Sequence, residues 1–147
     1  MQHKINSLRT RMKDNSVDLI ALGPGTHMNW LLGFNPYPDE RPCMLLIGKE
    51  KETFLMPSVN EEGIKEKTNI NMNSWSDADG PDQALQEALS FTGSSNAKHI
   101  VIDEAMRSHF ALTLIEALPN PTYEFTSSTI GALRMRKDDN EYSNLKE

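Results

Sequence analysis

Short apolar runs that alternate with segments of helical periodicity are the feature that most constrains the fold of this chain. Glycine, proline or charged residues end most of these runs, as expected for strands and helices separated by turns. The predicted helices are Gln2–Lys13, His27–Leu32, Val59–Lys67, a segment that begins near Pro81 and carries Ala84, Leu85, Ala88 and Leu89, and a segment from Phe110 to Leu118. The predicted strands are Val17–Leu22, Met44–Ile47, Thr53–Met56, Ile70–Trp75, His99–Asp103 and Thr122–Phe125.

This alternation contains one inserted hairpin, formed by Met44–Ile47 and Thr53–Met56 around a polar turn. It therefore predicts an α/β domain with a mixed sheet and helices on both faces. We also expect Thr26 to cap the short helix that ends before Gly33, and Ser127 or Ser128 to cap a last helix.

Size, charge and cysteine content exclude several classes of protein. The 147 residues are enough for one domain, and the formal charge of −6 without a long basic run argues against nucleic-acid or anionic-membrane binding. No apolar stretch approaches the roughly 20 residues of a membrane-spanning helix, and the first residues lack the apolar part of a signal peptide. The single cysteine, Cys43, excludes an internal disulfide and a cysteine metal cluster, so we expect a cytoplasmic protein.

The last residues have the pattern of a helix start. Asp138 and Glu141 have the spacing of a capping box, and Tyr142 and Leu145 begin a new apolar stripe about one turn before the last residue. A helix this short is not stable alone, so we interpret the chain as part of a longer protein. The expected division is a domain over residues 1–134 and a linker with the first turn of a further domain over 135–147.

No complete catalytic constellation is evident in the sequence. Cys43 precedes an apolar strand and is expected to be a core residue, and Gly23–Thr26 lacks the lysine of a phosphate loop. Asp103, Glu104 and His109 are grouped after a strand, but their spacing favours turn and cap roles over metal binding. We therefore predict no catalytic, cofactor or metal residue in this chain.

Arg41 is a candidate substrate-binding residue. It follows Glu40 near the end of a loop with three prolines, Asn35–Pro42. A stiff loop that presents a guanidinium group suits the recognition of a carboxylate. An internal salt bridge, for example with Asp39 or Glu40, and a solvated surface position are equally compatible with the sequence.

The segments Trp30–Phe34 and Glu40–Pro42 resemble the N-terminal domain of the creatinase/prolidase family of "pita-bread" metallopeptidases. Val17–Leu22 is similar to the first strand of that domain, and Leu133–Asp138, continued through Glu141 and Leu145, is similar to its junction with the catalytic domain. The chain departs from the family pattern at two positions, where Trp30 replaces the usual tyrosine and His27 replaces a frequent asparagine.

The resemblance implies a ribonuclease H-like mixed sheet and a parent enzyme that hydrolyses Xaa-Pro dipeptides or removes a residue that precedes proline. Two divalent metals, usually manganese, belong to its C-terminal catalytic domain and none to this chain. The implied partners are that domain, a second copy of the enzyme and short proline-containing peptides. Arg41 matches an arginine that contacts substrate across the dimer, and His27 is a weaker candidate. The alternatives are a free-standing binding module and a small hydrolase that uses Cys43.

Overall fold

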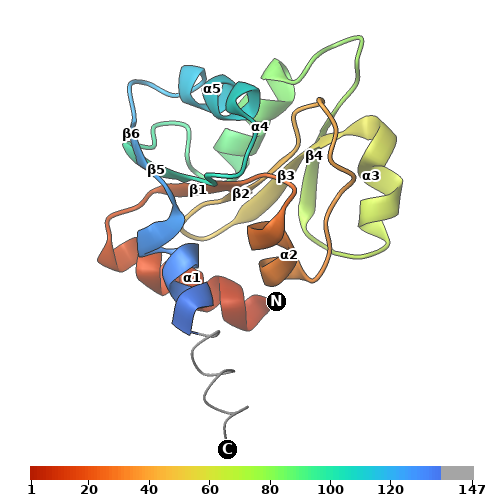
Figure 1. Ribbon diagram of the computed structural model, residues 1–147. Coiled ribbons are helices and arrows are strands. Elements are labelled where there is room, and N and C mark those ends of the chain that lie inside the picture. Colours follow the sequence, from red (N-terminus) through yellow and green to blue (C-terminus); the bar gives the residue numbers. More distant parts are fainter. Residues whose placement is uncertain (137–147) are drawn as a thin grey trace, which may run out of the picture.

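The predicted apolar runs form the strands of one six-stranded sheet in the computed structural model, which describes residues 1–136 (Figure 1). The expected capping box at Asp138 and all but the first two residues of the expected 135–147 segment lie outside the described residues. The strands are β1 (Leu19–Leu22), β2 (Met44–Ile47), β3 (Glu52–Pro57), β4 (Asn71–Trp75), β5 (His99–Ile102) and β6 (Thr122–Glu124). The helices are α1 (Gln2–Asp14), α2 (Thr26–Leu32), α3 (Ser58–Lys65), α4 (Asp82–Phe91) and α5 (Ser108–Glu116), followed by a 3₁₀ turn, η1 (Thr126–Ser128), and a helical segment over 130–136.

The strand order is β4-β3-β2-β1-β5-β6, and the sheet is mixed as predicted. β2 pairs antiparallel with β1 and β3, whereas the pairs β1–β5, β3–β4 and β5–β6 are parallel. In β1, Ile20 lies between Ile47 on β2 and Val101 on β5. Both edges of β1 are therefore occupied, and its four residues are buried.

Helices cover both faces of the sheet (Figure 1). Because side chains alternate along a strand, Ile20 and Leu22 face a core layer under α1, α2, α3 and the 130–136 helix, whereas Leu19 and Ala21 face a layer under α4 and α5. The α1 stripe of Ile5, Leu8 and Met12 closes the first layer, as the predicted periodicity requires. Within residues 1–136, no helix is both long and apolar enough to cross a bilayer.

Two expected caps are wrong. Thr26 is the first residue of α2 and makes no side-chain capping bond; its hydroxyl instead accepts a hydrogen bond from Arg134. Ser127 and Ser128 both belong to the 3₁₀ turn, and the last helix begins only at residue 130, so neither serine is its cap; the hydroxyl of Ser128 donates to Glu124. Gly33 ends α2 in the left-handed conformation, with φ 83°, as expected of a glycine at that position.

Candidate functional site

The proline-containing loop between α2 and β2 is fixed to the neighbouring strands at its C-terminal end. Trp75, the last residue of β4, donates from Nε1 to the carbonyl oxygen of Pro42 at 2.9 Å. Cys43 follows in the core, where its Sγ lies 3.9 Å from the sulfur of Met56. Because the next two residues, Pro42 and Cys43, are anchored, the backbone of Arg41 is fixed near the end of β4.

Arg41 is held by two aspartates. Its Nε and Nη2 donate to the two carboxylate oxygens of Asp77 at 3.0 and 3.1 Å, and its Nη1 donates to Asp39 at 3.2 Å. The other oxygen of Asp39 accepts the backbone N–H of Arg41 at 2.8 Å. The pairing with Asp39 was one alternative left open by the sequence, whereas Asp77, which is 36 residues away, gave no sequence signal.

Charge pairing at this position keeps both groups ionised. The hydrogen bond and charge of Asp77 raise the pKa of Arg41, and the bond from Arg41 lowers the pKa of Asp77 below its usual range. The side chains of Arg41 and Asp77 are 38% and 64% exposed, so water reaches this bidentate pair. The guanidinium group thus combines a fixed orientation with access from solvent, which a carboxylate-binding residue needs.

His27 lies in a second polar cluster, remote in sequence from its partners. Arg134, 107 residues away, donates from Nη1 to Nδ1 of His27 at 3.1 Å. Since a guanidinium group can only donate, Nδ1 is the acceptor and Nε2 bears the proton, which it donates to Glu104 at 2.7 Å. Thr126 donates both its backbone N–H and its hydroxyl to Glu104. The cluster therefore joins α2, the β5–α5 loop, η1 and the 130–136 helix.

The carboxylates of this cluster have opposite pKa shifts. Burial raises the pKa of Glu104, but hydrogen bonds from His27 and Thr126 outweigh it and lower the pKa to about 2. Burial raises the pKa of Asp103, and the backbone N–H of Ala105 offsets only part of this effect. Glu104 is thus the stable anion that faces the imidazole ring.

Metal binding is a poor fit to this cluster, although His27, Asp103 and Glu104 offer atoms within 4.8 Å of one another. The oxygens of Asp103 accept backbone N–H groups of Gly23 and Ala105, and those of Glu104 accept from His27 and Thr126. The cation of Arg134 also contacts the ring. A divalent ion would have to displace these donors and overcome that charge. His109, which the sequence placed in this group, instead packs edgewise against Phe110.

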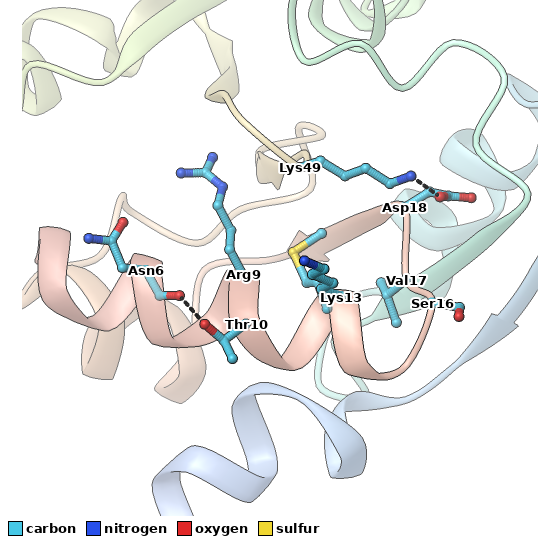
Figure 2. A pocket seen from close by; sticks show the side chains of 9 residues that line it. Asn6, Arg9, Thr10, Lys13, Ser16, Val17, Asp18 and Lys49 are labelled. Carbon is cyan, nitrogen blue, oxygen red and sulfur yellow. Dashed lines mark hydrogen bonds and ion pairs between the residues drawn. The ribbon is translucent and has the colours of Figure 1, made fainter.

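Two other places have the composition of a site but not its geometry. A cavity of about 640 Å³ beside α1 has three basic residues in its lining, Arg9, Lys13 and Lys49. Lys49 pairs with Asp18 at 3.0 Å (Figure 2), and Arg9 pairs with Glu52 at 2.7 Å. Ser128 of η1, Glu124 of β6 and His99 of β5 are adjacent, but the serine bonds to the glutamate and not to the imidazole. A catalytic serine needs the second contact.

Cys43 is buried, and burial is the main cause that raises the pKa of its thiol to about 12. This agrees with the interpretation of a core cysteine and argues against a nucleophile.

The fold and these clusters define an α/β domain with internally bound polar networks. The sequence matches the Creatinase/Prolidase N-terminal domain over residues 4–136, and the chain belongs to this family. Among solved structures it is similar to a dipeptidase from Pyrococcus horikoshii, with 26% identity and a TM-score of 0.80 over 90% of this chain and 36% of that one.

Two further structures share the fold. The creatinase/prolidase N-terminal domain of an X-Pro dipeptidase from Streptococcus pyogenes has a TM-score of 0.76 and 15% identity over 86% of this chain and 95% of that one. A prolidase from Thermococcus sibiricus has a TM-score of 0.75 and 21% identity over 90% of this chain and 36% of that one. The chain therefore spans about a third of the two longer enzymes. The comparison with curated proteins found no match.

Proposed function

We propose that this chain is the non-catalytic N-terminal domain of a cytoplasmic metallopeptidase that acts on Xaa-Pro peptides. The observation that supports this most directly is the family match over residues 4–136 together with a fold that covers 36% of a longer dipeptidase. Catalysis then belongs to a following domain with two divalent metal ions, expected to be manganese. The roles of this domain are dimerisation, control of access to the active site and contact with substrate.

The reading frame beyond Glu147 gives the simplest test. A continuation with carboxylates and a histidine suited to two metals supports the proposal, whereas a stop codon directly after Glu147 contradicts it and favours a free-standing binding module. A second test compares the longer protein with the 147-residue chain. Hydrolysis of glycyl-L-proline is measured for each of them in the presence of Mn²⁺. Hydrolysis by the shorter chain above a metal-only control contradicts the non-catalytic role.

Within this proposal, Arg41 contacts the substrate carboxylate in the active site of the dimer partner. Its accessible guanidinium group at an anchored loop end supports this assignment. A dipeptide has its free carboxylate next to the scissile bond, so a fixed fork there aids binding and orientation. His27 is a poorer candidate, since both ring nitrogens are engaged inside the domain.

Kinetics on the longer protein test the role of Arg41. Arg41→Ala is expected to lower kcat/KM for an Xaa-Pro dipeptide by roughly tenfold or more, and for a tripeptide by less, because the longer peptide places its carboxylate elsewhere. Arg41→Lys keeps the charge but lacks the fork, so it should also be impaired. Equal losses on both peptides, with dimerisation intact, leave Arg41 a structural residue only.

A further inference from the structure

The bidentate face of Arg41 is already filled by a carboxylate of the same chain. Asp77 accepts from Nε and Nη2 with both its oxygens, at 3.0 and 3.1 Å. This side-on arrangement is the one that an external carboxylate adopts on an arginine. An incoming carboxylate on this face therefore meets an occupied site.

The two aspartates around Arg41 are held differently. Asp39 also accepts the backbone N–H of Arg41, and its side chain is 23% exposed. Among residues 1–136, the Asp77 carboxylate bonds to Arg41 alone, and its side chain is 64% exposed, in the turn after β4. Asp77 can therefore leave while Asp39 continues to orient the guanidinium group.

The local charge also favours a displaceable Asp77 and a fixed Asp39. Two carboxylates on one guanidinium group leave a net negative charge that repels an external anion. When Asp77 turns toward solvent, Arg41 and Asp39 remain as a neutral pair with an open fork. The bond from Trp75 to Pro42 keeps the loop in place beside the end of β4, two residues before Asp77, so this exchange needs only a side-chain movement.

We propose that Asp77 is an internal competitor that occupies the carboxylate-binding face of Arg41 and that a ligand carboxylate must displace. The inference rests on the proposed function for the identity of the ligand, a dipeptide with a C-terminal proline. Asp77 then sets how strongly a carboxylate must bind before Arg41 accepts it. It is a specificity-determining residue and does not itself contact the ligand.

The test is an NMR titration of the 147-residue chain with glycyl-L-proline, followed at the Nε–Hε signal of Arg41, which is assigned by its loss in Arg41→Lys. Asp77→Asn removes the competing charge and one acceptor. Asp79→Asn is the matched control, because Asp79 lies in the same turn and bonds to Ser76, not to Arg41. Glycyl-L-prolinamide, which lacks the carboxylate, is the control ligand.

We expect Asp77→Asn to bind glycyl-L-proline roughly two- to fivefold more tightly than the wild type and Asp79→Asn. The expected effect is small because an exposed ion pair such as Arg41–Asp77 contributes little free energy. The inference is overturned if Asp77→Asn and Asp79→Asn bind glycyl-L-proline with equal affinity. It is also overturned if the Arg41 signal responds to glycyl-L-prolinamide as strongly as to glycyl-L-proline, or if Asp77→Asn shows no response up to the solubility limit. No hydrolysis is measured, so a failure of the proposed peptidase is detected separately by the assay on the longer protein.

Discussion

Nδ1 of His27 accepts a hydrogen bond from Arg134, which connects α2 to the helix over 130–136 near the end of the described chain. The second ring nitrogen of His27 bonds to Glu104, so the contact continues into the β5–α5 loop. The last described helix is therefore attached to the body of the domain by a polar link as well as by the buried Ile130.

Replacement of Arg134 by alanine tests this attachment. We expect a loss of about 0.5–1.5 kcal/mol of local stability, because the bonds to His27 and Thr26 disappear. The measurement is amide hydrogen exchange of Leu133, whose N–H bonds to Thr129. Arg136→Ala, on the exposed side of the same helix, is the control, and equal exchange in both variants contradicts the role of Arg134.

Glu104 should make stability depend on acid pH. Its pKa is about 2 in the folded chain against an ordinary 4.5, so its contribution is present above about pH 4.5 and is lost as the pH falls toward 2. With a side chain 44% exposed, the effect is reduced by solvent to about 1–2 kcal/mol. Denaturant unfolding of wild type and Glu104→Gln should differ at pH 7 and converge near pH 2; a constant difference argues against linkage through Glu104.

Two glycines in helices should respond oppositely to alanine. A Cβ at Gly63 meets no atom of residues 1–136 within 4 Å, so Gly63→Ala should stabilise α3 by about 0.5–1 kcal/mol. A Cβ at Gly131 lies 2.9 Å from the carbonyl oxygen of Thr126, so Gly131→Ala should destabilise by about 1–3 kcal/mol. Thermal unfolding measures both, and a stabilised Gly131→Ala variant shows that the 3₁₀ turn is not packed against this helix.

Cys43 should be inert in the folded chain. The rise of its thiol pKa from 9.0 to about 12 lowers the thiolate fraction about a thousandfold, and burial excludes the reagent as well. Iodoacetamide labelling followed by mass spectrometry should be slow in buffer and rapid in urea. Rapid labelling of the native chain shows that the end of the proline loop opens.

The hydrophobic pattern predicted the strands and helices because buried side chains recur about every two residues in a half-buried strand and every three to four in a helix. A short stretch of sequence is enough to show this repeat. It placed Val17 in the first strand, whereas the backbone N–H of Val17 bonds to Met12 and the strand begins at Leu19. Strand order is not a local property, so the place of β5 next to β1 could not be predicted from it.

The candidate site was predicted only in part, for a similar reason. The three prolines and the family resemblance identified the loop of Arg41, and Asp39 is close enough in sequence to be considered. Asp77 has no pattern that distinguishes it from other surface acids, because its role depends on the parallel pairing of β3 and β4. The partners of His27 are likewise defined by packing, since Glu104 and Arg134 lie 77 and 107 residues away.

The position of β1 between β2 and β5 also affects the order in which a growing chain can fold during synthesis. The edge that faces β2 can close once the hairpin has left the ribosome, but the other edge pairs with residues 100–102, which emerge much later. Until then, a fully apolar strand has unpaired backbone groups along one side. Nascent chains that stall between Pro57 and His99 are therefore those most exposed to association with other unfinished chains.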